Sequence, residues 1–263
     1  MIMKNIKYIL MTVVAALFVT SCDWFALDNM ESYDATIAGK FVDAETGALV
    51  PSEVYGSQTG VFKIFELGWD AEAAQTWYIK NNGTYRNNLV WAGDYRMETN
   101  DANYYPFTQK FTLNKGDNEV DFAVKPFVRF LNQEFKYDTA SKKIIATCTV
   151  QVTDPAQTGN LNEVRLCCYT DCHVGTSFNN CKNDANAVAS NVQFDADGKA
   201  TVTVAIDTQN SANATEFKYE RVHYVRLAAL ATGAGVNSSS RYNYTQTYSI
   251  ALDGSAAVEY TKW

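Results

Sequence analysis

The chain has 263 residues, 47% hydrophobic and 19% charged, which is enough apolar material for one large or two small packed domains and excludes wholesale disorder. Its 22 Lys and Arg residues against 29 Asp and Glu give a net charge of −7. Such a chain has no general basic surface to neutralise a phosphate backbone, so the composition argues against nucleic acid and against a polybasic membrane patch. Any membrane attachment must come from the N-terminus or from a lipid.

Residues 1–21 have the features of a secretory signal peptide. Lys4 and Lys7 precede an apolar run, Tyr8–Val19, which ends in small and polar residues. The run is shorter than the roughly 20 apolar residues that a membrane-spanning helix needs. We expect this segment to be removed and to take no part in the fold.

The end of this segment, Val19-Thr20-Ser21-Cys22, resembles the lipobox of bacterial lipoproteins. The resemblance implies that Cys22 becomes the acylated first residue and that residues 22–33 form a lipidated tether to the outer membrane. An ordinary signal peptide that ends in a chance cysteine is the alternative. Asp23 after the lipid-bearing cysteine is similar to the export signal of Bacteroidetes-type lipoproteins, which implies a place at the cell surface.

Beyond the tether, apolar residues recur at every second position, which predicts half-buried β-strands. Val120, Phe122 and Val124 form one stripe, and alternate residues of 144–152 form another. Asn82-Gly83 predicts a hairpin turn. Further turn signals lie at 43–47, 114–116 and 195–198. Short strands at this spacing predict an all-β chain of antiparallel β-sandwiches.

Pro126 follows the first stripe and removes a backbone donor from any sheet ladder, so we place a domain boundary there. The boundary divides the mature chain into residues 34–126 and 127–263. Two tandem sandwiches of these sizes fit ordinary domains better than one very large sheet.

The first unit contains Gly83-Thr84-Tyr85 and, after a short gap, the run Leu89–Met97. These motifs resemble the signature of carboxypeptidase-regulatory-like, or prealbumin-like, seven-stranded sandwiches. The physical pattern agrees, because Gly93 permits a tight turn that places Tyr95 and Met97 on one face of the next strand.

Together with the lipobox, the segments Thr36–Asp43, Phe65–Trp69 and Glu163–Leu166 resemble a two-domain lipoprotein family of unknown function. Members of that family are expected beside the porin and lipoprotein pair of starch-utilisation-type glycan uptake systems. The resemblance implies a prealbumin-like first sandwich and an immunoglobulin-like second sandwich. The cysteine-rich segment after Leu166 departs from the family pattern.

The second unit contains five cysteines: Cys148, Cys167, Cys168, Cys172 and Cys181. An odd number leaves at least one unpaired. Alternation directs Cys148 and Cys168 inward as buried thiols, although a bridge across the core is also open to them. Cys172 and Cys181 flank a polar loop, and a disulfide between them would persist in an exported protein. Zinc is the rival interpretation, with His173 as a further ligand, but the irregular spacing does not match structural zinc sites, so we predict no metal.

Sequence motifs for hydrolytic or cofactor chemistry are missing. The two histidines, His173 and His223, lie too far apart in the sequence to form H-E-x-x-H, and the chain has no G-x-S-x-G. Asp195–Gly198 resembles half of a calcium loop without its remaining oxygen ligands, and a hairpin turn explains it better. A glycosidase needs only two carboxylates, which no linear motif encodes. We predict a non-enzymatic protein with no cofactor.

Aromatic residues make up 13% of the chain, and sugar-binding sandwiches use exposed aromatic faces against pyranose rings. The strand patterns around Trp77 and Trp91 direct these side chains into the core. Aromatic residues in polar, irregular segments are better candidates for ligand binding, and we select Trp69, Tyr104 and Tyr105. The alternative for each is a lid on its own core.

The leading hypothesis is a lipid-anchored, non-catalytic accessory protein of an outer-membrane glycan uptake complex, which binds a polysaccharide or the partner lipoprotein. It follows from the family resemblance. The alternative is a structural or adhesive surface protein whose prealbumin-like unit serves assembly and binds no sugar.

Overall fold

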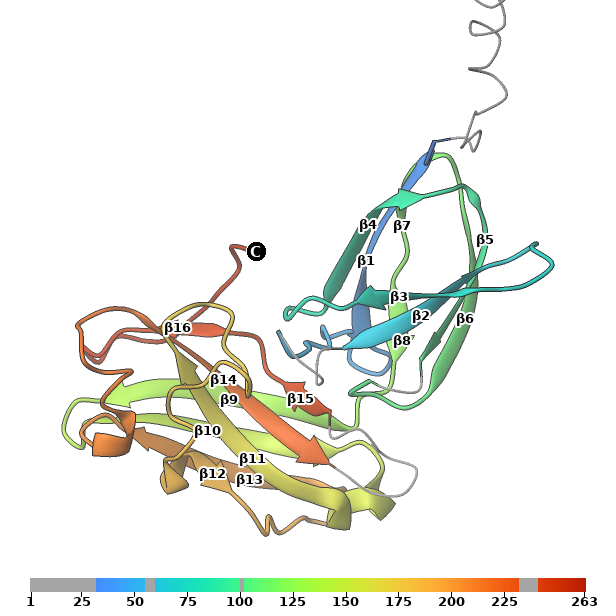
Figure 1. The fold of residues 1–263 in the computed structure, drawn as a ribbon. Coiled ribbons are helices and arrows are strands. Elements are labelled where there is room, and N and C mark those ends of the chain that lie inside the picture. Colours follow the sequence, from blue (N-terminus) through green and yellow to red (C-terminus); the bar gives the residue numbers. More distant parts are fainter. Residues whose placement is uncertain (1–31, 55–59, 100–101, 232–240) are drawn as a thin grey trace, which may run out of the picture. The chain divides into compact units, whose positions relative to one another are not determined.

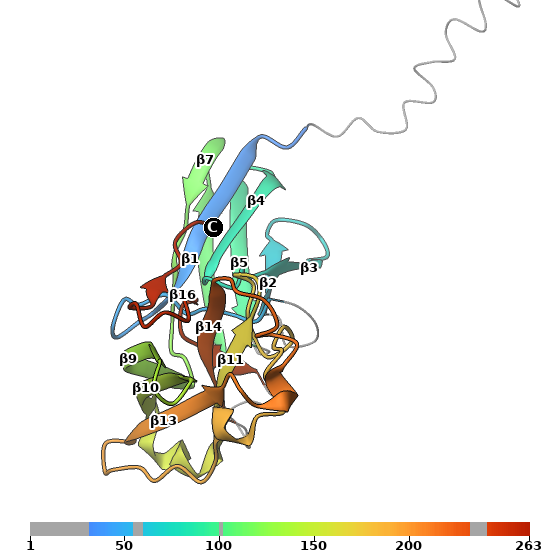
Figure 2. The same cartoon turned by 90° about the vertical axis from the view of Figure 1, so that its left-hand side faces the viewer.

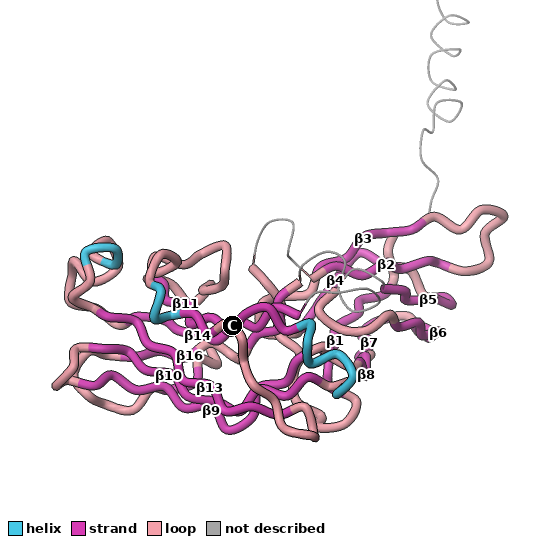
Figure 3. Tube along the Cα trace, turned by 90° about the horizontal axis from the view of Figure 1, so that it is seen from below, coloured by secondary structure: helices cyan, strands magenta, loops and turns pink. Residues whose placement is uncertain are grey.

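The computed structural model describes residues 32–54, 60–99, 102–231 and 241–263. The signal segment, Cys22 and nearly all of the tether lie outside the described residues, so their predicted roles stay predictions. Within the described residues, no helix has the length and apolar character needed to cross a membrane. Helical structure in this part is limited to short 3₁₀ turns (cyan in Figure 3): η1 (Pro155–Asn160), η2 (Ala185–Ala187) and η3 (Ser211–Asn213).

The first sandwich consists of two four-stranded sheets, blue to green in Figure 1. One sheet is built on β1 (Ala35–Asp43), which pairs with β4 (Thr84–Val90), β7 (Gly116–Glu119) and β8 (Phe122–Val124). The other has the order β3 (Ala74–Tyr78), β2 (Val61–Glu66), β5 (Gly93–Thr99), β6 (Phe107–Leu113). All pairs are antiparallel except those of β7 and β8, which run parallel to β1.

The apolar stripe around residue 122 is shorter than its sequence pattern predicts. Val120 and Asp121 form a break between β7 and β8, and the strand proper begins at Phe122. Gly39 of β1 explains the break, because a Cβ there would lie only 1.8 Å from the carbonyl oxygen of Val120. That oxygen accepts a 2.6 Å hydrogen bond from the hydroxyl of Tyr85.

The turn at Asn82-Gly83 is present, and Gly83 adopts a positive φ of 86°. It is not a hairpin turn, however, because β3 pairs with β2 and β4 pairs with β1. The turn instead carries the chain from one sheet to the other. Local sequence specifies the reversal of the chain, but which strands pair depends on the sheets that receive them.

Alternation along the strands places the apolar residues of the first sandwich between its sheets. Tyr95 and Met97 are both buried, which confirms their predicted common face. At the centre is a cluster of aromatic rings whose centroids lie 5.0 to 6.1 Å apart in the contacting pairs: Phe41, Phe62, Tyr85, Tyr104 and Phe122.

The second sandwich, green to red in Figures 1 and 2, also has two sheets. The smaller sheet has the order β13 (Lys199–Asp207), β10 (Lys143–Val152), β9 (Val128–Asp138). The larger has the order β12 (Val188–Ala189), β11 (Leu161–Tyr169), β14 (His223–Ala231), β16 (Tyr248–Ile250), β17 (Val258–Glu259), with β15 (Tyr242–Tyr244) also paired to β14. Every second residue of β10 is buried, as its alternation predicts. The all-β fold of two tandem sandwiches is thus confirmed.

Arg226 joins the two sandwiches. It lies on β14 and is fully buried. Its guanidinium donates to the carbonyl oxygens of Thr245 and Val174 in the second sandwich, and to those of Ser52 and Asn81 in the first, over 3.1 to 3.2 Å. The buried cation therefore fixes the segments around residues 52 and 81 against the second sandwich.

Glu53 is the buried carboxylate of the same interface. Its Oε2 accepts hydrogen bonds from the backbone N–H and hydroxyl of Thr176 and from the hydroxyl of Tyr244, at 2.5 to 2.9 Å. The ring of Tyr244 in turn lies 4.1 Å from the guanidinium carbon of Arg226. Opposite charges and an aromatic face thus compensate each other in a region without solvent.

Asp43 and Arg129 form a second buried ion pair between the sandwiches. Burial alone would raise the pKa of Asp43, but the hydrogen bonds from Arg129 and from the backbone of Glu45 outweigh it and hold the pKa below its ordinary value of 3.8. A depressed pKa in the folded state means that this carboxylate stabilises the fold above pH 3.8 and loses that effect as the pH falls further.

We therefore expect Asp43→Asn to reduce the acid sensitivity of the protein. The wild type should lose more unfolding free energy than Asp43→Asn between pH 5 and pH 3, as measured by urea denaturation at each pH. Asp197→Asn, which removes an exposed carboxylate, serves as the control and should keep the wild-type pH dependence. Equal acid sensitivity in all three proteins would show that Asp43 does not contribute.

Candidate functional site

An aromatic cleft of about 540 Å³ is the best candidate for a binding site. Its described lining combines aromatic, amide and cationic side chains from both sandwiches: Val54, Tyr78, Ile79, Lys80, Asn81, Asn82, Cys172, His173, Tyr260, Lys262 and Trp263. Apolar faces beside a few polar groups are the usual composition of a small-molecule or saccharide site.

The first sandwich contributes the end of β3 and the turn that follows it. Trp77 points into the core, so its neighbour Tyr78 must point out of the sheet, and 63% of Tyr78 is exposed. The carbonyl of Asn81 is held by Arg226. The buried ion network thus fixes the position of one wall of the cleft.

The second sandwich contributes the segment after β17 and the loop after β11. Tyr260 is held by a 2.8 Å backbone hydrogen bond to Thr247, and its ring meets that of Trp263 edge to face at 5.0 Å. Trp263 also packs against His173, yet 44% of it remains exposed. An indole held by two rings and open on its remaining surface can stack on a ligand at little entropic cost.

The polar lining contains a hydrogen-bonding group that the protein does not use. Asn81 is only 7% exposed, and its amide Nδ2 has no hydrogen-bond partner among the described residues. The neighbouring Asn82 is already engaged, because its Oδ1 accepts from the backbone N–H and hydroxyl of Thr84. Nδ2 of Asn81 is itself buried, so a ligand oxygen in the cleft could accept a hydrogen bond from it only after the side chain turns outward.

Cys172 lies at the rim of the cleft and is partly exposed, and burial raises the pKa of its thiol. It does not pair with Cys181, because all five described cysteines are free thiols. The prediction of a Cys172–Cys181 disulfide is therefore corrected. Cys181 is fully buried in the core of the second sandwich, where its backbone N–H and that of Cys168 both donate to Oδ1 of Asn179.

Two groups of side chains have donor atoms close enough to face a metal ion. One is buried and consists of Cys168, Glu216 and His223; the other is the exposed run Asp171–His173. In the buried group Glu216 already accepts a 2.6 Å hydrogen bond from His223 and a 2.7 Å bond from Asn180. The structure therefore explains this group as an internal hydrogen-bond network.

Trp69 lies in the loop between β2 and β3, where 59% of it is exposed. It lines a separate hollow of about 420 Å³ with the acidic Glu66 and Asp70. Its exposure agrees with the sequence analysis, whereas its role in ligand binding stays a prediction.

Tyr104 and Tyr105 differ from the exposed loop aromatics that the sequence suggested. Tyr104 is only 2% exposed and stacks on Phe41 at 5.5 Å in the core of the first sandwich, so the expectation of an accessible face is corrected. Tyr105 is half-buried and packs edge to face against Phe127 at 4.8 Å. Both tyrosines therefore pack against the protein interior although polar residues surround them in the sequence. This is the alternative stated in the sequence analysis, in which a loop aromatic covers its own core.

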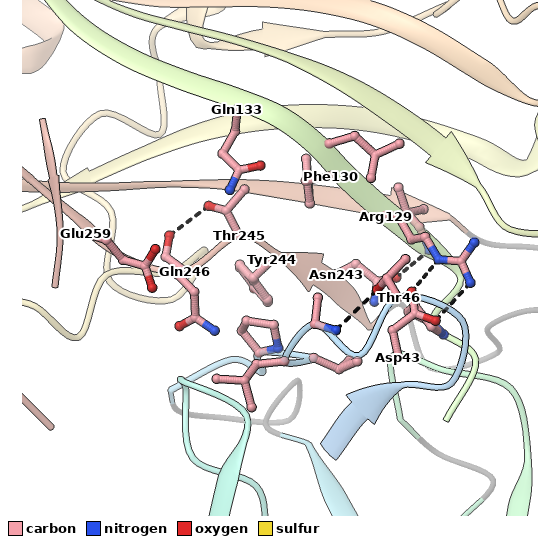
Figure 4. A pocket seen from close by; sticks show the side chains of 17 residues that line it. Asp43, Thr46, Arg129, Phe130, Gln133, Asn243, Tyr244, Thr245, Gln246 and Glu259 are labelled. Carbon is pink, nitrogen blue, oxygen red and sulfur yellow. Dashed lines mark hydrogen bonds and ion pairs between the residues drawn. The ribbon is translucent and has the colours of Figure 1, made fainter. Parts of the chain in front are cut away.

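A third hollow of about 300 Å³ lies beside the Asp43–Arg129 ion pair (Figure 4). Its aromatic ring systems are those of Phe130 and Tyr244, and Tyr244 is buried. The charges there compensate each other, since Arg129 bonds both Asp43 and Glu45. Glu259 also lines this hollow and forms no ion pair with a described residue, so its free charge is negative, whereas the side chains that line the aromatic cleft include two lysines.

Sequence reasoning missed Tyr78, Tyr260 and Trp263. Alternation with Trp77 would have directed Tyr78 outward, but one exposed aromatic residue says nothing about its neighbours. The residues of the cleft come from four segments far apart in the chain, around residues 54, 80, 172 and 262. Only the packing of the two sandwiches brings them together.

Comparisons with known proteins identify relatives of this chain in Bacteroides and Parabacteroides. The family model described as "Protein of unknown function (DUF3823) N-terminal domain" matches residues 35–125. The crystal structure of "a putative carbohydrate binding protein" from Bacteroides uniformis is 31% identical, covers 84% of this chain and 100% of its own, and superposes with a TM-score of 0.71. No curated protein matches.

Structures of two DUF3823 family proteins share the fold. The one from Parabacteroides merdae is 17% identical with a TM-score of 0.66, covering 82% of this chain and 98% of its own. The one from Bacteroides ovatus is 21% identical with a TM-score of 0.62, covering 83% and 100%. None of these three proteins carries an enzyme name. The chain belongs to the DUF3823 family.

Proposed function

We propose that this protein is a lipid-anchored, non-catalytic surface protein that binds carbohydrate in the aromatic cleft and serves an outer-membrane glycan uptake system. The lining of the cleft is the observation that carries the proposal. Tyr78 and Trp263 offer open ring faces, and pyranose rings stack on such faces through their C–H groups. The name of the 31% identical relative supports the same ligand class.

The aromatic rings and the polar groups of the cleft are expected to contribute differently to binding. Ring faces supply apolar contact with little orientation, whereas hydrogen bonds to the polar side chains of the lining select the positions of hydroxyl groups. Because Arg226 holds the backbone of Asn81, the site is organised before a ligand arrives. Preorganisation of this kind lowers the cost of binding.

We expect Tyr78→Ala and Trp263→Ala each to weaken polysaccharide binding about ten- to hundredfold, since truncation of a central interface aromatic costs about 1 to 3 kcal/mol. Binding is measured with the purified full chain in mild detergent, by affinity electrophoresis through a panel of soluble polysaccharides and then by calorimetry. Both side chains are exposed, so the melting temperature should not change.

Tyr219→Ala provides the matched control, because Tyr219 is equally exposed but lies outside the cleft. Trp69→Ala tests the other open aromatic residue. If binding is lost only in Trp69→Ala, the ligand site is the hollow of Trp69 and the cleft is not involved. If no polysaccharide binds to the wild type, carbohydrate binding is wrong and a role in surface assembly becomes the better hypothesis.

Membrane attachment is proposed to depend on Cys22. Acyl chains contribute about 0.8 kcal/mol for each buried CH₂ group, and two or more chains hold a protein stably on a bilayer. We therefore expect Cys22→Ala to be released from membranes or to accumulate as the uncleaved precursor, as judged by fractionation and gel mobility. A Cys22→Ala protein that stays with the membrane at the size of the processed wild type would contradict the anchor.

A further inference from the structure

The charge of the aromatic cleft differs from that of the chain. Acidic residues outnumber basic ones in the protein, 29 to 22. Of the described residues that line the cleft, none is acidic, whereas Lys80 and Lys262 are cationic. The side chains of the lining itself therefore carry positive charge, although the carboxylate of Asp171 borders them through its 2.5 Å contact with His173.

These two lysines are not neutralised by the protein. Both are exposed, and neither forms an ion pair with any described residue. Lys80 is positioned by its backbone, whose N–H donates to the carbonyl of Thr84 at 2.8 Å. Lys262 lies between Tyr260 and Trp263, two rings of the lining. Both lysines thus line the same cleft as the aromatic rings, and neither has an ion-pair partner among the described residues.

The geometry of a bound sugar would bring its charged substituents from the aromatic rings toward the two lysines. A pyranose ring that stacks on an aromatic face directs its equatorial substituents outward, around the edge of the contact. A carboxylate at C5 or a sulfate ester on the ring would therefore project toward the lining beside the stacked face, where the lysines are.

We infer that the aromatic cleft selects anionic saccharides, which carry uronate or sulfate groups, over neutral ones. This inference rests on the proposed function, because it names the ligand class of the same site. The stacked ring supplies most of the affinity, and the two lysines supply the discrimination. In many interfaces charged groups likewise contribute more to specificity than to affinity.

The test uses pairs of polysaccharides that differ in charge alone, with the purified full chain in detergent. Polygalacturonate and its fully methyl-esterified form compare a carboxylate with a neutral ester on one backbone, and dextran sulfate and dextran compare a sulfate with a hydroxyl. We expect the charged member of at least one pair to bind at least tenfold more tightly than its neutral partner. Which pair responds identifies carboxylate or sulfate as the recognised group.

Two further results are expected if the lysines are responsible. The affinity for the charged polysaccharide should fall as NaCl rises from 20 to 300 mM, because exposed charges are screened. Lys80→Gln and Lys262→Gln should each weaken it about two- to fivefold, as for an exposed ion pair of up to about 1 kcal/mol, and the arginine variants should restore it. Lys110→Gln, which removes an exposed lysine outside the cleft, should change nothing.

The outcomes separate this inference from the proposed function. If neutral polysaccharides bind as tightly as charged ones, and Tyr78→Ala abolishes that binding, the cleft is a saccharide site and the inference about charge is wrong. If charged polysaccharides bind but Lys80→Gln, Lys262→Gln and Lys110→Gln weaken them equally, the binding is a general ionic effect and the inference is again wrong. If nothing binds, charged or neutral, the proposed function fails as well.

Discussion

Replacement of Arg226 by methionine should lower the free energy of unfolding by about 3 to 5 kcal/mol, as when one partner is removed from a buried ionic interaction, because it removes a buried cation that makes four hydrogen bonds and interacts with the charge of Glu53. Methionine fills much of the same volume but leaves the carbonyl oxygens of Ser52, Val174 and Thr245 without the donor that Arg226 supplies, whereas that of Asn81 keeps the backbone N–H of Ser52. Each buried acceptor left unsatisfied is costly, although the individual costs are not additive.

The measurement is urea denaturation of the full chain, followed by tryptophan fluorescence and by far-UV circular dichroism. Because Arg226 bonds both sandwiches, its loss should also separate their transitions, so that the two probes no longer coincide. Arg86→Met, at an exposed site on β4, should change stability by less than about 0.5 kcal/mol. If Arg226→Met lowers the free energy of unfolding by less than 1 kcal/mol, the hydrogen bonds of the guanidinium contribute little to stability, because water molecules can replace them.

Arg226→Met should also affect ligand binding in the aromatic cleft, which lies next to the hydrogen bonds of Arg226. Arg226 holds the carbonyl of Asn81, and Asn81 lines the cleft. At temperatures where Arg226→Met is still folded, we expect weaker saccharide binding even though Arg226 itself is buried and touches no ligand.

Tyr104→Ala should destabilise the protein by about 3 to 5 kcal/mol, as for other large aromatic residues removed from a core. The ring of Tyr104 is almost fully buried and stacks on Phe41, so its removal leaves a cavity in the core of the first sandwich. Saccharide binding by the folded fraction should be unchanged, because Tyr104 does not line the cleft.

Leu89→Ala serves as the control for Tyr104→Ala. Leu89 is a large apolar side chain of the same sandwich, but it is exposed, so its truncation should have little effect on the melting temperature. A Tyr104→Ala protein that melts like the wild type but has lost its ligand would reverse the assignment and return Tyr104 to the binding surface.

Arg226 shows that sequence periodicity does not predict the burial of every strand residue. Val225 and Leu227 of β14 face the core of the second sandwich, so alternation assigns Arg226 to the opposite, solvent-facing side. That side is covered, since Cys167, Ala228 and Tyr244 form a second buried cluster there. A sequence pattern records which face of a strand is apolar, but not whether another part of the chain packs on the polar face.

The sequence by itself determined the fold class and which residues of a strand point to the same face. Alternation in β1, β5 and β10 is a local property, because successive side chains of an extended backbone must point to opposite faces. Positive-φ glycines such as Gly83 and Gly198 likewise mark turns through their own backbone preference. These features require no knowledge of distant residues.

Only the tertiary structure decided the sites. The parallel pairing of β7 and β8 with β1, the burial of Tyr104 and the separation of Cys172 from Cys181 each depend on which segments meet. The aromatic cleft depends on this most of all, since its walls come from the segment between β1 and β2, the turn after β3, the loop after β11 and the segment after β17. The free energy that unites them comes from long-range burial and from buried ion pairs, which local sequence patterns do not encode.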